Sequence, residues 1–183
     1  MSMEMQERQF VLDQLDASEV RLLKLVEGLT PAQWIFREAP ERWTIAENIE
    51  HLIVFENFIL ETIQKVLSEP PENGKRAFAA EKEPAVLGLA KSRATDKLIA
   101  RVLLRPSGRW RDMSEMLAEL KKTRVRTVAF VLETQADLRS HFFPHIALGD
   151  LDCYQWLVVL GQHGERHALQ IEEVKVDPDY PAA

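Results

Sequence analysis

The sequence has few features that would allow disulfide bonds, secretion or insertion into a membrane. It has one cysteine, Cys153, so no disulfide can form within the chain, and we expect a protein of the reducing cytoplasm. The first residues are polar and partly acidic, so no signal peptide is expected. No apolar run approaches the ~20 residues that a membrane span needs, and membrane association is not expected.

An excess of positive charge is also missing. The 23 Lys and Arg residues are outnumbered by 29 Asp and Glu residues, and the net charge is -6. The basic residues are scattered as well, so a nucleic-acid partner is not expected. Only seven glycines and few alternating β-branched runs favour an all-α fold. A chain of 183 residues fits one domain over 1–183.

Four long helices are predicted from the spacing of apolar residues and from capping residues. The first helix is expected from about Glu4 to Gly28, and the second begins with the capping box Thr44-Ile-Ala-Glu47 and runs to about Leu67. The third is expected from Asp112 or Ser114 to about Leu138, and the fourth over Leu151–Lys175. A short helical turn is expected at Thr30-Pro31.

Two segments between these helices are less regular. Residues 69–111 contain the turns Pro70-Pro71-Glu-Asn-Gly74 and Arg105-Pro-Ser-Gly108, and we expect them to cover one end of the helices. A helical piece is expected between Ala94 and Leu104. Residues 140–149 are expected to form an interhelical loop, with the last helix beginning at Asp150.

Four of the five histidines form pairs with a spacing of four residues. His141 and His145 have Pro144 between them, so we interpret them as loop residues with local hydrogen bonds. His163 and His167 lie in the apolar stripe of the last helix and point the same way, one turn apart. This spacing can hold a metal ion or can belong to histidines of the core.

His51 favours the metal over the core interpretation. It lies on the predicted inward face of the second helix, below Glu47 and above Phe55. Three neutral imidazoles, His51, His163 and His167, are typical of a Zn²⁺, Ni²⁺ or Fe²⁺ site. Three protein ligands leave a coordination position open, as in catalytic sites. The alternative, three core histidines without an ion, requires three independent positions to face one another by accident.

Two segments resemble motifs of the DinB/YfiT-like superfamily. Trp43-Thr-Ile-Ala-Glu-Asn-Ile-Glu-His51-Leu, followed by Glu56, is similar to its second-helix motif, and His163-Gly-Glu-Arg-His167-Ala-Leu-Gln170-Ile to its fourth-helix signature. His145-Ile-Ala-Leu-Gly149-Asp-Leu followed by Trp156-Leu resembles the lead-in to that helix. The match covers nearly the whole chain in order and spacing.

This resemblance implies a four-helix bundle of up-down-down-up course, a homodimer, and a divalent metal bound by His51, His163 and His167. Relatives include thiol-dependent S-transferases, a mycothiol-dependent isomerase and metal-dependent hydrolases. The resemblance therefore implies a small-molecule substrate and allows a low-molecular-weight thiol as cosubstrate. One departure from the family pattern is that Gly161 and Gly164 sit inside the helix around the first ligand of the pair, where each costs about 1 kcal/mol relative to Ala.

Several other residues have two interpretations. Glu47 can orient an imidazole or act as a base near the metal, but its capping-box role is favoured. Arg124 lies in an inward stripe, where it can hold an anionic substrate or pair with a Glu of an adjacent helix. Gln170 can donate to the histidine cluster or bond between helices. Cys153 is expected in the core rather than as a ligand or nucleophile.

The leading hypothesis is a metal-dependent hydrolase or thiol-dependent S-transferase, because an ion with an open position activates either water or a thiol. The alternative is a non-catalytic metal-binding or stress-associated bundle protein, in which the metal is structural or absent. The sequence does not separate hydrolysis from S-transfer.

Overall fold

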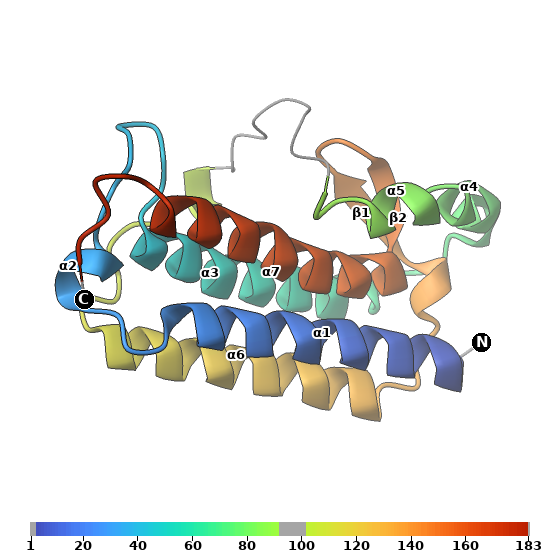
Figure 1. Cartoon of the computed structure of the whole chain (residues 1–183). Coiled ribbons are helices and arrows are strands. Elements are labelled where there is room, and N and C mark those ends of the chain that lie inside the picture. Colours follow the sequence, from blue (N-terminus) through green and yellow to red (C-terminus); the bar gives the residue numbers. More distant parts are fainter. Residues whose placement is uncertain (1–2, 92–101, 183) are drawn as a thin grey trace.

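The structure is a computed structural model that describes residues 3–91 and 102–182. Four long helices form the body of the protein (Figure 1). They are α1 (Met5–Val26), α3 (Ile45–Val66), α6 (Met113–Glu133) and α7 (Cys153–Lys175). In Figure 1, α1 and α7 run one way and α3 and α6 the other, which confirms the predicted up-down-down-up four-helix bundle. Each of α1 and α3 packs against both α6 and α7.

The helix ends follow local sequence signals. Thr44 accepts from the Glu47 amide and Glu47 accepts from the Thr44 amide, which is the predicted capping box of α3. Gly28 has a φ of 69°, a left-handed conformation that suits glycine just beyond the end of α1. The short helix α2 (Pro31–Trp34) begins where Thr30 and Pro31 predict it.

The bundle interior consists of two hydrophobic clusters with polar side chains between them. Leu15, Ile63 and Leu157 belong to one cluster, and Leu22, Ile49 and Ile171 belong to the other. The buried polar residues at the middle of the bundle include Ser18, His51, Glu56, Thr123, Arg124 and His167. The sequence therefore places hydrogen-bonding groups at mid-bundle, on all four helices.

The connection between α6 and α7 differs from the expected loop. Two short strands, β1 (Phe142–His145) and β2 (Gly149–Asp152), form an antiparallel hairpin, with Phe143 opposite Leu151. Because Gly149–Asp152 pair with β1, α7 begins at Cys153 rather than at Asp150. α6 ends at Glu133 rather than at Leu138, since Leu138 enters the core from a 3₁₀ turn, η3 (Leu138–Ser140).

Short helices cover the bundle end at which α7 begins. They are η1 (Asn73–Lys75), α4 (Arg76–Ala80) and α5 (Glu83–Leu87), and α5 packs on α7. Arg139 connects this end, because it pairs with Glu7 of α1, Glu83 of α5 and Asp152, the N-cap of α7. The helical piece expected between Ala94 and Leu104 lies mostly outside the described residues; the last of it is η2 (Val102–Leu104).

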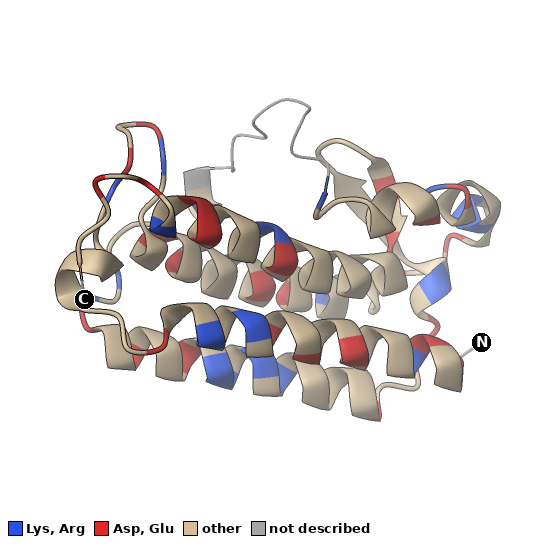
Figure 2. Cartoon of the chain, viewed as in Figure 1, with Lys and Arg blue, Asp and Glu red and all other residues tan. Residues whose placement is uncertain are grey.

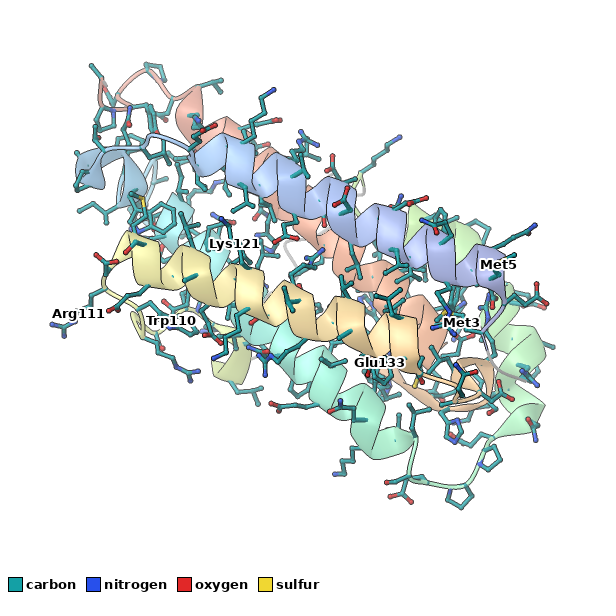
Figure 3. The ribbon with its side chains drawn as sticks, turned by 90° about the horizontal axis from the view of Figure 1, so that it is seen from below. Met3, Met5, Trp110, Arg111, Lys121 and Glu133 are labelled. Carbon is teal, nitrogen blue, oxygen red and sulfur yellow. The ribbon has the colours of Figure 1, made fainter. Side chains whose placement is uncertain are left out.

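The underside of the bundle is formed by α1 and α6 alone. Figure 3 shows the two helices side by side, with Met5 at the start of α1 and Glu133 at the end of α6 at the same end. Figure 2 shows acidic and basic segments on the helices, with several basic segments close together on α1 and α6. Among the described residues, every helix is too short or too polar to cross a membrane.

Candidate metal centre

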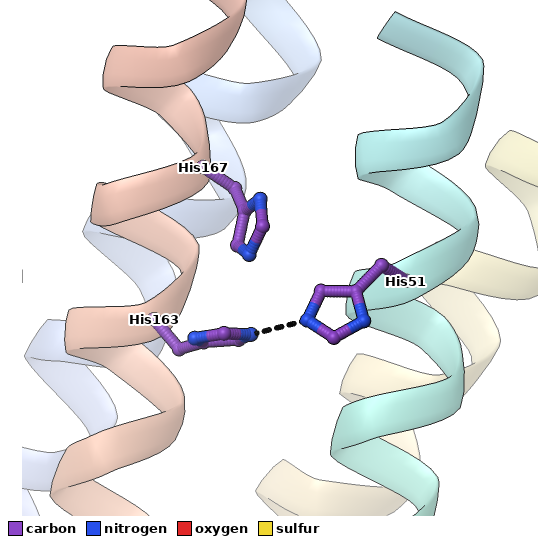
Figure 4. A group of neighbouring side chains, drawn as sticks. All are labelled: His51, His163 and His167. Atoms are coloured by element: carbon purple, nitrogen blue, oxygen red, sulfur yellow. Dashed lines mark hydrogen bonds between the residues drawn. The ribbon is translucent and has the colours of Figure 1, made fainter. Parts of the chain in front are cut away.

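The structure brings His51 of α3 together with His163 and His167 of α7 (Figure 4). One side-chain nitrogen from each residue lies within 4.8 Å of the other two. The Nε2 atoms of His51 and His163 are 3.0 Å apart. Nitrogens bound to one tetrahedral ion at 2.0–2.1 Å are about 3.3 Å apart, so the three imidazoles fit a common ion with small side-chain movements.

Hydrogen bonds orient two of the three rings. The Leu104 carbonyl lies 2.6 Å from His51 Nδ1 and can only accept, so the ring carries its proton there and leaves Nε2 as a lone pair. Asn48 Oδ1 lies 2.7 Å from His167 Nδ1, while Asn48 Nδ2 donates to the Thr44 carbonyl. Asn48 Oδ1 is thus an acceptor, and His167 Nε2 is also free to ligate. Such outer partners fix tautomer and orientation at metal sites.

Aromatic rings surround the cluster. The Trp43 ring stacks on His167 with an angle of 11° and a centroid distance of 6.0 Å, and its centroid is 4.8 Å from that of His51. The Phe55 ring lies 4.1 Å from His163. These contacts restrict the imidazole rings and explain why Trp43 belongs with His51 in the sequence motif.

The electrostatic environment keeps the imidazoles neutral at pH 7. Burial lowers the pKa of His51, against the opposing effect of its hydrogen bond to Leu104. Burial lowers the pKa of His163 and His167 further, and the positive charge of Arg166 adds to this effect. Neutral imidazole is the form that binds metal ions.

A loop tethered to α3 supplies the Leu104 carbonyl. The Glu50 carboxylate, 2% exposed, accepts hydrogen bonds from the backbone amides of Ser107, Gly108 and Arg109 at 2.8–3.2 Å. Burial opposes ionisation of Glu50, but these donors together outweigh it and hold its pKa below the usual value. Glu50 therefore fixes the segment that orients His51.

The cluster lies in the wall of a cavity of about 770 Å³ between α3 and α7. Residues 41–43 before α3, residues of the hairpin, and Leu89, Leu104 and Arg105 complete the lining. The volume is within the range of small-molecule sites. The three histidines can therefore act on a ligand that the cavity holds.

The two catalytic candidates from the sequence do not line this cavity. Glu47 completes the capping box of α3 and pairs with Arg37. Arg124 forms a buried ion pair with Glu56 at 2.9 Å and donates to Ser18. Both residues thus make the structural contacts that the sequence analysis gave as the other interpretation. Glu56 is the acidic residue of an adjacent helix that pairs with Arg124.

The remaining candidates are placed as follows. Gln170 lines the cavity, and the hydrogen bond between its side chain and His167 raises the pKa of His167, against the larger lowering by burial. An added Cβ at Gly161 or Gly164 would lie 2.8 Å from Gln14 Cβ or 2.9 Å from Ser18 Cβ, so these glycines allow α1 to approach α7. Cys153 is fully buried, as expected.

Sequence reasoning missed the place of His145 in the cavity lining. Both His141 and His145 make the expected local hydrogen bonds, and His145 Nδ1 accepts from the amides of Ala147 and Leu148. A neutral ring with Nδ1 as acceptor carries its proton on Nε2. The hairpin places His145 in the cavity lining. In the sequence, the sign of a turn after His145 was Gly149, which begins β2 with a left-handed φ of 66°.

Comparisons with known proteins agree with this fold. The profile of the DinB superfamily matches residues 14–171, and the chain belongs to that superfamily. The uncharacterized protein YuaE of Bacillus subtilis is 28% identical over 150 residues, 82% of this chain and 88% of YuaE. YfiT of Bacillus subtilis, described as a probable metal-dependent hydrolase with an unusual four-helix bundle topology, has a TM-score of 0.60 at 19% identity, over 95% of this chain and 89% of YfiT.

Proposed function

We propose that the protein is a metal-dependent hydrolase of small molecules, with a divalent ion held by His51, His163 and His167. The observation that carries this proposal is the convergence of three neutral imidazoles in the wall of a cavity. Zn²⁺, Ni²⁺ and Fe²⁺ all suit three nitrogen ligands. Such an ion supplies Lewis acidity, which makes water or a thiol nucleophilic near neutral pH. The description of YfiT as a probable metal-dependent hydrolase supports the same reaction class.

The protein's own residues prepare the site for this chemistry. Leu104 and Asn48 hold the Nδ1 protons of His51 and His167, so that both Nε2 atoms face the cluster. The rings of Trp43 and Phe55 pack against the imidazoles and restrict their orientation. Glu47 and Arg124 have no contact with the cavity, and the proposal gives them structural roles only.

Metal analysis of three purified proteins tests the site. Wild-type protein is expected to hold one divalent ion per chain, and His163→Ala is expected to lose most of it. Gln162→Ala is the matched control, since Gln162 neighbours His163, lines the cavity and bonds to Gln14. Equal metal content in wild type and His163→Ala contradicts the proposal.

Thiol-dependent S-transfer is the second candidate. It uses the same ion, and it is favoured by a cavity that extends on both sides of the histidines along α3 and α7, with room for two reactants. Turnover of an electrophilic substrate that requires a low-molecular-weight thiol identifies S-transfer. Turnover with water alone identifies hydrolysis.

A non-catalytic bundle protein is distinguished by chelation. Removal of a catalytic ion abolishes turnover and lowers the melting temperature little, whereas removal of a structural ion lowers it greatly. A homodimer and a location in the cytoplasm remain further predictions.

A further inference from the structure

The hairpin between α6 and α7 contributes one histidine to the cavity. His145, the last residue of β1, lines the cavity and is half-buried. Its ring packs against Trp156 with a centroid distance of 5.3 Å. Trp156 and His163 are seven residues apart and therefore share a face of α7, two turns or about 10.5 Å from each other. His145 thus lies in the same cavity as the proposed metal centre, on the side of the hairpin, which covers the first turns of α7 (Figure 1).

The backbone after His145 determines which ring nitrogen carries the proton. The amides of Ala147 and Leu148 donate to His145 Nδ1 at 3.2 and 3.3 Å. A backbone amide can only donate, so Nδ1 is an acceptor and the ring proton is on Nε2. Protonation of Nδ1 would break both hydrogen bonds. The turn therefore favours a neutral ring with one N–H group, at Nε2.

This N–H group has no acceptor in the part of the chain that the structure describes. Both printed bonds of the His145 ring involve Nδ1, and no described residue accepts from Nε2. The two ring nitrogens point in different directions, so Nε2 points away from the turn when Nδ1 faces it. A donor without a partner costs free energy unless a ligand or water accepts from it. His145 therefore offers a hydrogen-bond donor to a ligand in the cavity.

The neighbours of this donor are apolar. Phe143, Pro144 and Ile146 of the hairpin line the cavity beside it, and Trp156 packs on its ring. The rings of Phe143 and Trp156 are stacked with centroids 4.4 Å apart. Trp156 Nε1 already donates to the Phe143 carbonyl at 3.1 Å, so the indole N–H is not available to a ligand. This wall gains binding free energy from apolar groups of a ligand.

Other polar groups of the lining already donate within the protein. The Thr62 hydroxyl donates to the Phe58 carbonyl at 2.7 Å, and the Gln162 amide donates to Gln14 at 2.8 Å. The charged residues of the lining carry both signs; they are Glu41, Arg42, Arg105 and Arg166. Binding of an uncharged ligand does not depend on them.

We infer that His145 donates from Nε2 to an uncharged oxygen of the substrate, such as the carbonyl oxygen of an ester or amide, whose apolar part packs against Phe143 and Trp156. The apolar neighbours disfavour an ion, because a charge that leaves water has a large desolvation cost. A placed donor also rejects an analogue that lacks the acceptor. The reaction at the metal rests on the proposed function, but this binding preference does not, since its groups belong to the protein.

Two probes of nearly the same shape test the donor. Acetophenone has a ring and a carbonyl oxygen, and α-methylstyrene has a methylene group in place of that oxygen. Ligand-detected NMR titration measures both Kd values, with metal-free and with Zn²⁺-loaded protein. The probes differ in hydrophobicity, so the quantity compared is the change in each Kd between wild type and variant.

His145→Asn removes the donor and keeps the turn, because the Asn side-chain oxygen can accept from the same amides. It is expected to raise the Kd of acetophenone about tenfold and to change that of α-methylstyrene by less than about twofold. His145→Gln, whose amide nitrogen reaches further, is expected to bind acetophenone more tightly than His145→Asn. Equal changes for both probes in His145→Asn, or no change for either, overturn the inference.

His141→Asn is the matched control. His141 precedes the same hairpin and bonds to the carbonyls of Asp137 and Glu69, but it does not line the cavity. The substitution is expected to leave both Kd values unchanged.

NMR signals of the ring nitrogens test the donor in the wild-type protein, without any substitution. We expect a protonated Nε2 and an unprotonated Nδ1 for His145. The Nε2 signal is expected to shift on addition of acetophenone but not of α-methylstyrene. A proton on Nδ1, or an equal response to both probes, overturns the inference.

The metal-free titrations separate this inference from the proposed function. A selective loss of acetophenone binding by metal-free His145→Asn supports the inference, whatever the metal content of the purified protein. If His145→Asn changes neither Kd in metal-free protein and acetophenone binds only with Zn²⁺, the ion holds the carbonyl oxygen. That result overturns the inference and leaves the metal proposal intact.

Discussion

Asn48 shows how one residue can serve both the fold and the site. Its amide nitrogen donates to the Thr44 carbonyl at the start of α3, and its oxygen accepts from His167 of α7. The first bond fixes which end of the amide faces the histidine. The side chain is 1% exposed, so water cannot replace either bond. The tautomer of His167 is therefore set by a residue three positions before His51.

We expect Asn48→Ala to weaken metal affinity about 10–100-fold, because His167 loses the acceptor that holds its Nδ1 proton. Titration with Zn²⁺ against a competing chelator measures this loss. Asn57→Ala is the matched control, since Asn57 belongs to the same helix and contacts Thr123 and Arg126 of α6. Equal affinity of Asn48→Ala and wild type contradicts the assigned role.

Cys153 is expected to be inert in the native protein. The side chain has no exposed surface, and burial raises the pKa of its thiol. The nucleophilic form of cysteine is the thiolate, so both effects slow its reactions. A thiol-reactive aromatic disulfide at pH 8 is expected to label the folded protein very slowly and the unfolded protein completely. Rapid labelling of the folded protein contradicts the core placement.

Among the elements, α7 depends on two glycines for its contact with α1. Ala at position 161 improves helix propensity by about 1 kcal/mol, but its Cβ would lie 2.8 Å from Gln14 Cβ and 3.2 Å from the Gln14 backbone. Overpacking of this kind costs about 1–3 kcal/mol. We therefore expect Gly161→Ala to lower the free energy of unfolding, as measured by urea denaturation.

Gly74→Ala is the control for this variant, because no heavy atom lies within 4 Å of an added Cβ there and its backbone has no left-handed conformation. It is expected to leave the free energy of unfolding nearly unchanged. A stabilised Gly161→Ala protein would show that the two helices separate easily. The close contact of α1 and α7 would then be dispensable.

The start of α6 is expected to weaken in acid. The Ser114 hydroxyl and the Glu115 amide donate to the Asp112 carboxylate, and these bonds lower its pKa from 3.8. Because the pKa of Asp112 is lower in the folded than in the unfolded state, its carboxylate stabilises the folded state above pH 3.8. This stabilisation is lost as the pH falls through the pKa that Asp112 has in the folded state. Asp112→Ala is thus expected to lower the melting temperature at pH 7 and to match wild type more closely near pH 2.5. A difference that stays constant with pH contradicts this.

At the scale of the whole molecule, the four helices could be predicted because their signals are local. Thr44 and Glu47 fix the start of α3, and Gly28 and Pro31 separate α1 from α2. His163 and His167 share a face through helical geometry alone. The motif around His51 predicts that α3 and α7 contribute ligands to the same metal site.

The rest of the site depends on contacts between distant segments. The pairing of Phe143 with Leu151 extends the hairpin, delays the start of α7 and brings His145 to the cavity. The Leu104 carbonyl reaches His51 across 53 residues because Glu50 binds the following amides. Neither effect follows from spacing or propensity. Arg124 had two interpretations, and only the packed position of Glu56 shows which contact it makes.

The resemblance also predicts a homodimer, which is a property of the whole molecule. Sedimentation equilibrium at micromolar concentration is expected to give twice the mass of 21.0 kDa. The same measurement on His163→Ala shows whether assembly depends on the metal centre. A single chain at these concentrations contradicts the prediction.

The bond between His51 and Leu104 has a consequence for divergence. Its acceptor is a main-chain oxygen, which every amino acid possesses. Substitutions of Leu104, which lines the cavity, can therefore change the shape of the cavity while the orientation of the imidazole persists. Substrate specificity can therefore change in evolution without a change in metal ligation. A search for a conserved side chain opposite His51 would miss this hydrogen bond, because its acceptor is a main-chain oxygen.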